Sequence, residues 1–342
     1  MSDESRVRVT HTDLESAILR ERPSLSGTEL ARSAEISTEQ AKRLWRALGF
    51  PAHADDVVAY LPSDAQAIST LRGVMAGGVL DDDLAVNMPR ALGQTMARLA
   101  EWEVTALVQR VEQLHETGAA GAEGAEGAEG GVPGSRVGSA LQLVEELSEP
   151  FEELLIYAWR RHLAAAAARI EALAADDEDL HTVELTVGFA DIVGFTALSN
   201  TLTEERIGDL VELFEMRCAD VVAAQRGRVI KSIGDSVLFV NDDPLGAYDT
   251  AEGIINVIGR DPRMPDVRVG LASGSVVLRL GDVFGPPVNM AARLTNVARR
   301  NRIITDEATS RLLPADQFET RRMAARPVRG FGIVEPVAVR RH

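Results

Sequence analysis

Apolar and polar residues alternate most regularly just after the middle of the chain. Every second residue of one segment is apolar, which predicts a half-buried strand that ends at Asp191. The apolar members are Val183, Leu185, Val187 and Phe189. Helical apolar spacing follows the strand, and it places the single cysteine, Cys218, on the buried face of a helix.

Shorter apolar runs downstream predict further strands. Two of them, at 229–231 and 237–240, are joined by residues 232–236, which predicts a hairpin with Asp235 just ahead of its second strand. Strands are also expected at 267–271, 276–278, 302–305 and 337–339, and we expect the last of these to close the sheet. Strands that alternate with helices and include central hairpins predict a ferredoxin-like α+β sandwich.

Residues 10–117 read instead as mostly helical. Helices are predicted at 28–34 and 38–48, with Ser37 and Gln40 forming a capping box and Gly49 ending the second helix. This pair resembles a helix-turn-helix. Because the charges of the segment nearly cancel, a structural helical pair is favoured over a DNA-binding one.

Two segments connect these halves. Residues 118–139 are rich in glycine, alanine and glutamate, which predicts a flexible linker. Residues 140–180 return to a helical pattern, with an apolar face formed by Leu154, Leu155, Ala158, Trp159, His162 and Leu163. Such a helix either transmits a signal to the following strand or serves as a simple spacer.

The residues at the strand ends suggest a chemistry. Sheet pairing would bring Asp191 and Asp235 together, and paired carboxylates offer the oxygen ligands that hard divalent cations prefer. Gly194 and Gly234 lie close to them and would allow a phosphate to approach the backbone. Downstream, Asn289 and Arg293 are spaced to share one face of a helix.

Together these residues resemble the catalytic domain of class III nucleotide cyclases. The resemblance runs from about Val183 to Val339 and rests on Asp191, Lys231 and Asp235 with the segment from Gly281 to Arg293. It implies that Asp191 and Asp235, assisted by the Ile192 carbonyl, hold two Mg²⁺ or Mn²⁺ ions. These ions would assist attack of the 3′-hydroxyl of ATP on its α-phosphorus, which yields cyclic AMP and diphosphate.

The same resemblance assigns the substrate contacts. Lys231 and Asp282 would read adenine, whereas guanylyl cyclases typically carry glutamate and a small residue at these positions. Asn289 would orient the ribose and Arg293 would stabilise charge on the α-phosphate. Around the triphosphate, the resemblance implies contacts from Phe195, Thr196 and Arg329. Arg321, Arg322 and Arg326 lie nearby as alternatives to the last of these.

Composition limits the partners, cross-links and location that we expect for this chain. The net charge of −16 argues against nucleic acid as the main partner, and a single cysteine excludes an intrachain disulfide. Without a signal peptide or an apolar run long enough to span a bilayer, the chain is expected in the cytoplasm with no membrane span.

The predicted organisation has four parts. A helical regulatory domain (1–117) is followed by the linker (118–139), a helical transducer (140–180) and a catalytic domain (181–342). Since cyclase sites form between two catalytic domains and this chain has one complete set, we expect a homodimer. We expect the N-terminal part to be autoinhibitory and to respond to protons or a small apolar ligand. A response to protons would involve histidines, which change charge near neutral pH. The chain has His11, His53, His115, His162, His181 and His342.

Two other functional classes fit parts of the sequence. One is a catalytically silent cyclase-like module that only binds nucleotide or a partner. The intact residue set argues against it. The other is a transcription regulator that uses the helix-turn-helix-like segment, with nucleotide as its effector.

Overall fold

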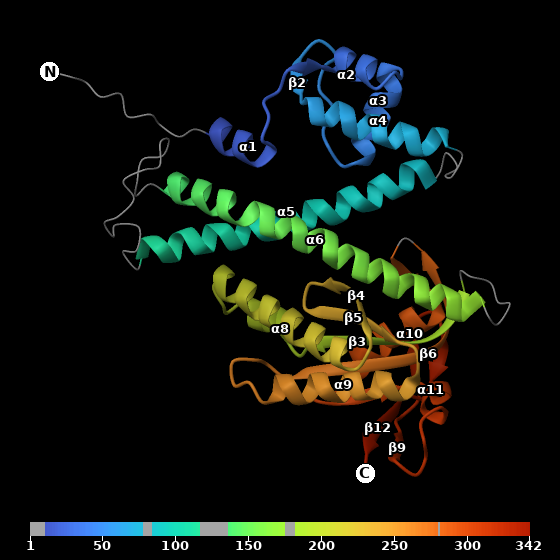
Figure 1. Ribbon diagram of the computed structural model, residues 1–342. Coiled ribbons are helices and arrows are strands. Elements are labelled where there is room, and N and C mark those ends of the chain that lie inside the picture. The colour runs from blue at the N-terminus through green and yellow to red at the C-terminus, as the bar shows by residue number, and fades with distance from the viewer. Residues whose placement is uncertain (1–10, 78–83, 117–135, 175–181, 280) are drawn as a thin grey trace. The chain divides into compact units, whose positions relative to one another are not determined.

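The computed structural model describes residues 11–77, 84–116, 136–174, 182–279 and 281–342 (Figure 1). The chain divides into two compact units, Met1–Ala164 and Ala165–His342, and helix α6 (Arg136–Ala174) crosses the boundary between them. Most of the predicted linker, 118–139, lies outside the described residues. Among the described helices, none is long and apolar enough to cross a membrane.

The first unit is mainly helical, as the sequence predicts. A two-stranded ribbon pairs β1 (Leu25–Ser26) with β2 (Val58–Tyr60) beside a small core. The other elements are α1 (His11–Leu19), α2 (Gly27–Ser33), α3 (Thr38–Ala47), α4 (Pro62–Ala76) and α5 (Leu84–Glu116). The core consists mostly of aliphatic side chains from α2, α3 and α4, packed around Trp45 and Tyr60.

The capping signals of the helical pair are confirmed. The Ser37 hydroxyl accepts from the Gln40 backbone N–H at 3.2 Å, and the Gln40 side chain accepts in return from the Ser37 N–H at 3.2 Å. At the other end, Gly49 adopts φ +92°, a conformation that suits glycine after a helix. The helices α2 and α3 therefore start and stop within a residue or so of the positions that the sequence predicts.

The apolar face predicted for α6 has few apolar partners in the described chain. Leu154, Trp159 and Leu163 are each more than half exposed. Hydrophobic spacing predicted this helix correctly, but spacing alone cannot specify whether another element covers the apolar face.

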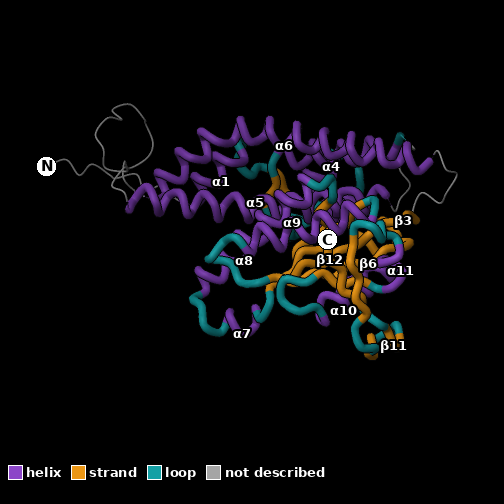
Figure 2. The backbone as a smooth tube through the Cα atoms, turned by 90° about the horizontal axis from the view of Figure 1, so that it is seen from below, coloured by secondary structure: helices purple, strands orange, loops and turns teal. Residues whose placement is uncertain are grey.

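The second unit is built on an eight-stranded sheet that can be followed in orange in Figure 2. Its strand order is β4-β5-β3-β6-β8-β12-β9, with β7 paired to β6. Only β6 and β8 are parallel; the other pairs are antiparallel. The strands are β3 (Thr182–Ile192), β4 (Arg228–Ile233), β5 (Ser236–Asn241), β6 (Val267–Arg279), β7 (Asp282–Phe284), β8 (Ile303–Thr305), β9 (Phe318–Arg322) and β12 (Val337–Arg341). A separate ribbon pairs β10 (Arg326–Val328) with β11 (Gly332–Val334).

Helices pack on both faces of this sheet. One apolar core joins the sheet to α8 (Glu204–Ala224) and α9 (Pro244–Gly259), and it includes the buried Cys218. A second core joins the opposite face to α10 (Pro286–Val297). Two short helices, α7 (Phe195–Ser199) and α11 (Glu307–Arg311), complete the unit.

Three sequence-based expectations about the sheet are wrong in detail. Strand β3 is buried on both faces, not one, because it is central and helices cover both sides. The runs at 267–271 and 276–278 form one continuous strand, β6. Strand β12 does not close the sheet, since β9 pairs with its outer edge. A charged strand such as Phe318–Arg322 lacks the apolar alternation that would have predicted it.

Candidate active site

Strand pairing brings Asp191 and Asp235 together at one end of the sheet. In the register between β3 and β5, Asp191 lies opposite Ser236, the residue that follows Asp235. The Ile192 backbone N–H donates to the Asp235 carbonyl oxygen at 3.1 Å, which ties the hairpin turn to the end of β3. Strand pairing therefore places Asp191 and Asp235 next to each other, as the sequence predicts, and their shared binding of a metal stays a prediction.

The Asp191 carboxylate is buried and held from two sides. One oxygen accepts a short hydrogen bond from the Ser236 hydroxyl. The other accepts from Nε of Arg268 at 2.7 Å and lies 2.6 Å from its Nη2. These contacts fix the orientation of the carboxylate before any ligand arrives.

Sequence reasoning missed Arg268. This residue lies on β6 directly opposite Asp191 on β3, and its Nη1 also donates to the Asn296 carbonyl at 3.2 Å. The available signal was a lone arginine between Val267 and Val269 in an apolar run, where a buried charge requires a partner. Identifying that partner required the register between the two strands.

The electrostatics of Asp235 favour a bound cation. Burial raises the pKa of this carboxyl above its ordinary value, and the negative charge of Asp191 raises it further, while Arg268 acts in the opposite direction. A divalent cation between the two carboxylates would relieve both effects. Groups of three or more His, Cys, Asp and Glu suited to a metal do not occur in the described residues, so the candidate centre consists of this pair. The pair fits hard, oxygen-liganded ions.

A second pair forms between Lys231 on β4 and Asp282 on β7. The Lys231 ammonium donates to Oδ2 of Asp282, and Oδ1 of Asp282 accepts from the Val283 backbone N–H at 2.9 Å. Both side chains are partly exposed, so a ligand can reach them. A cationic donor and an anionic acceptor thus lie side by side. Such a pair can form hydrogen bonds with adjacent polar atoms at the edge of a planar ligand.

Asn289 and Arg293 lie one turn apart on the exposed side of α10. The opposite side of this helix is buried against the sheet through residues such as Ala291 and Leu294. A Cβ at Gly270 of β6 would lie 2.4 Å from the Ala291 carbonyl oxygen, so only glycine permits this close approach of α10. The sheet therefore fixes the position of the helix that carries Asn289 and Arg293.

The remaining candidates lie at turns. Gly194 adopts φ +73° where β3 gives way to α7, Phe195 packs partly into the core, and Thr196 is exposed. Arg329 is exposed in the turn between β10 and β11. Within the described residues, no hydrogen bond or ion pair connects Arg329 with Asp191 and Asp235 or with the Lys231–Asp282 pair.

Comparison with known proteins agrees with this arrangement. The sequence model of the adenylate and guanylate cyclase catalytic domain matches residues 179–339. An adenylate cyclase from Streptomyces coelicolor is 37% identical over 350 residues, which cover 94% of this chain and 87% of that protein. An adenylate cyclase from Streptomyces griseus is 35% identical, covering 90% and 83% respectively. A pH-sensitive adenylate cyclase from Mycobacterium tuberculosis is 30% identical, covering 93% and 78%.

The similarity to the Streptomyces proteins extends well beyond the catalytic domain, through most of the N-terminal unit. All residues that the cyclase sequence model matches lie in the second unit, where strand pairing places Asp191 and Asp235 next to each other. The chain therefore belongs to the class III adenylate and guanylate cyclase family.

Proposed function

We propose that this protein is an adenylate cyclase that converts ATP to 3′,5′-cyclic AMP and diphosphate. In this reaction the 3′-oxygen forms a bond to the α-phosphorus, the bond from that phosphorus to the diphosphate oxygen breaks, and the 3′-hydroxyl proton is released. The meeting of Asp191 and Asp235 at the ends of paired strands carries the proposal. The adenylate cyclases that resemble the whole chain support ATP as the substrate.

Class III cyclase domains use divalent metal ions, and Asp191 and Asp235 are the groups we assign to hold them here. We infer two ions per site, Mg²⁺ or Mn²⁺, with the Ile192 carbonyl as a further ligand. Bound ions would lower the pKa of the attacking hydroxyl and neutralise charge on the phosphates. The protein's own contribution is to hold Asp191 rigidly through Ser236 and Arg268.

Lys231 and Asp282 are the groups we assign to read the base. The lysine would donate to a ring nitrogen of adenine, and the aspartate would accept from the exocyclic amine. Guanine presents a carbonyl oxygen in place of that amine, and an aspartate would repel it. Their present ion pair keeps both side chains in position, and a bound base would replace part of it. Changing Lys231 to glutamate together with Asp282 to cysteine should depress ATP use more than GTP use.

For the rest of the nucleotide, we infer that Asn289 orients the ribose and that Arg293 stabilises the negative charge that develops at the α-phosphate. Both are exposed on α10 and can reach a ligand. We assign Phe195, Thr196 and Arg329 to the triphosphate. Because ATP is the substrate, we place the reaction in the cytoplasm.

The proposed reaction is tested by incubating the full chain with ATP or GTP and each metal, and identifying the product. We expect cyclic AMP from ATP, no product without metal, and a strong preference for ATP over GTP. A folded protein that forms no cyclic AMP with either metal would favour the catalytically silent alternative.

We propose further that the active enzyme is a homodimer with two equivalent sites. Asp191 and Asp235 of one subunit would face Lys231, Asp282, Asn289 and Arg293 of the other. Each chain carries one complete residue set within its single catalytic unit. Two chains together can therefore form two equivalent sites, each with one half of the set from either chain, which supports this arrangement.

For regulation, we propose that the N-terminal unit holds the catalytic units in a less active arrangement and responds to protons or a small apolar ligand. The long helix α6, which runs from the first unit into the second, supports a mechanical link. The test compares full-length protein with residues 165–342 in a pH series at fixed metal and ATP. We expect the shorter protein to be more active and less sensitive to pH. If the two proteins have the same pH profile and the same specific activity, the N-terminal unit neither inhibits the enzyme nor makes it sensitive to pH.

A further inference from the structure

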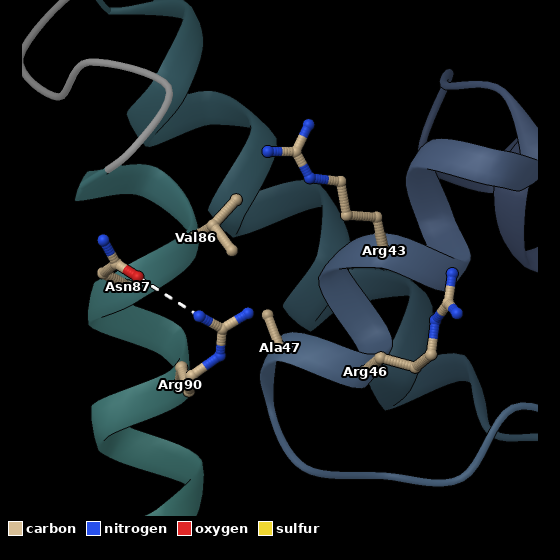
Figure 3. Close-up of a pocket in the computed structure, with 6 residues that line it drawn as sticks. All are labelled: Arg43, Arg46, Ala47, Val86, Asn87 and Arg90. Atoms are coloured by element: carbon tan, nitrogen blue, oxygen red, sulfur yellow. Dashed lines mark hydrogen bonds between the residues drawn. The ribbon is translucent and has the colours of Figure 1, made fainter.

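A cavity of about 490 Å³ lies within the N-terminal unit, between α3 and α5. Figure 3 shows that the Arg43 and Arg90 side chains extend from these two helices into the space between them. The cavity is lined by Arg43, Arg46, Ala47, Val86, Asn87 and Arg90. Its size is within the range of small-molecule sites in proteins.

The helices that form this cavity are packed tightly against each other. A Cβ at Gly93 of α5 would lie 2.0 Å from the carbonyl oxygen of Leu48, which follows α3, so the two backbones are in direct contact there. Ala47 and Val86 are buried and supply apolar surface beside the charged groups. The cavity is therefore formed between two packed helices of the N-terminal unit.

Among the described residues, three arginines and no acidic residue line this cavity. The Arg43 and Arg90 side chains extend into it, whereas the Arg46 side chain points away from the space between α3 and α5 (Figure 3). Within the described residues, the Arg43 side chain makes no hydrogen bond or ion pair. Among the described groups, Arg90 donates only to a neutral one, Oδ1 of Asn87 at 3.3 Å, and the Asn87 amide nitrogen donates to none of them. Arg46 donates to the Lys42 carbonyl, and its nearest carboxylate, on the highly exposed Glu39, is 3.6 Å away. In the part of the chain that the structure describes, Arg43 and Arg90 therefore have no carboxylate partner.

We propose that this cavity binds a small molecule carrying at least two phosphate or carboxylate groups. Guanidinium groups match the oxygens of both anions with paired hydrogen bonds, and Asn87 can add a neutral donor. One anion contacting Arg43 on α3 and Arg90 on α5 would bridge the two helices. The site lies outside the catalytic unit and would couple an anionic metabolite to the N-terminal unit.

The packing favours a small anion over DNA. Arg43 and Arg46 are on the second helix of the helix-turn-helix-like pair, which would have to enter a groove of DNA to read bases. Here that helix packs against α5, and Arg43 points into the space between the two. Arg43, Arg46 and Arg90 are all exposed, so a compact anion can enter the space between α3 and α5 and reach Arg43 and Arg90 without any rearrangement of the chain.

Isothermal titration calorimetry on the full chain tests the proposal, with citrate and inorganic diphosphate as separate probes at constant ionic strength. We expect saturable binding of at least one probe. The double variant Arg43→Gln/Arg90→Gln should weaken that binding at least about tenfold, because two charge-assisted hydrogen bonds are lost. Arg98→Gln, an exposed arginine further along α5, should change affinity less than about twofold. Circular dichroism and melting temperature confirm that each variant is folded.

Several results would overturn the proposal. One is that neither probe binds, and another is that Arg98→Gln weakens binding as much as the double variant. A third concerns Asp81, Asp82 and Asp83, which precede α5 in the sequence and lie outside the described residues. If citrate or diphosphate binds only after these are changed to asparagine, the chain's own carboxylates occupy the site. Binding of duplex DNA, but of neither small anion, would likewise exclude a small-anion site.

Discussion

The two oxygens of the Asp191 carboxylate are held by different partners. Arg268 provides a charged contact across the sheet, and Ser236 provides a neutral one from the neighbouring strand. A side chain restrained in this way loses little freedom when it binds a cation, and partners of this kind commonly contribute 10–100-fold to metal affinity or activity.

Ser236→Ala tests this positioning role. We expect activity to fall roughly 10–100-fold, with a higher metal concentration needed for half-maximal rate, because Asp191 loses its neutral partner. Ser275→Ala, an exposed serine on β6 of the same sheet, should leave both quantities unchanged. An unaltered metal requirement in folded Ser236→Ala protein would show that this hydroxyl does not position Asp191.

Asp235 predicts a pH effect on stability in metal-free protein. Its pKa in the folded chain is raised, first by burial and then by Asp191, so the ionised form lowers stability at every pH above the unfolded value. Asp235→Asn removes that charge. We therefore expect the variant to be more stable than the natural protein at neutral pH, as measured by urea unfolding with a chelator present.

The direction of the Asp235 pKa shift determines the pH range over which the variant and the natural protein should differ in stability. As the pH falls through the raised pKa and then the ordinary value for aspartate, the natural protein becomes protonated and the difference should vanish. Added Mg²⁺ or Mn²⁺ should reverse the order at neutral pH, because only the natural carboxylate binds the cation. An advantage of the variant that persists unchanged at acid pH would contradict the electrostatic explanation.

At the scale of elements, the contact between α10 and β6 places Asn289 and Arg293. Gly270→Ala would force a methyl group against the Ala291 carbonyl and the Thr295 backbone. We expect this overpacking to cost about 1–3 kcal/mol of unfolding free energy and to lower activity by displacing α10. Urea unfolding and a cyclic AMP assay measure the two effects.

The matched control is Gly259→Ala at the end of α9, where an added Cβ meets no atom within 4 Å. This change should leave activity intact and alter stability by no more than about 1 kcal/mol, in the stabilising direction. If both alanine variants behave alike, the close approach at Gly270 does not position the helix.

The sequence predicts elements of this fold better than their environments. Period-two alternation and capping signals located β3, the β4–β5 hairpin and the α2–α3 pair, because these are local properties. They could not show that helices cover both faces of β3 or that β9 pairs outside β12, since both depend on partners distant in sequence. The meeting of Asp191 with Asp235 followed from the predicted hairpin and resemblance to a family, whereas Arg268 required the register between β3 and β6.

At the scale of the whole molecule, a single catalytic unit carries every group that we assign to the reaction. The residues that we assign to the metal ions lie on β3 and the β4–β5 turn, and Asn289 and Arg293 lie on α10. In a site shared between two subunits, one chain would contribute the metal-site residues and the other chain would contribute Asn289 and Arg293. This arrangement makes the account testable by combining chains that are damaged in different halves.

The most direct measurement is cyclic AMP formation by mixed variants. Asp191→Ala and Arg293→Ala proteins should each be folded and nearly inactive. After subunit exchange in equal amounts, about half of the dimers contain one of each chain and one intact site, so activity should recover to about a quarter of the natural value. Mixing Asp191→Ala with Asp235→Ala should restore nothing, because both changes damage the same half. No recovery in the first mixture despite demonstrated exchange, or equal recovery in both, would contradict the shared ATP-cyclising site.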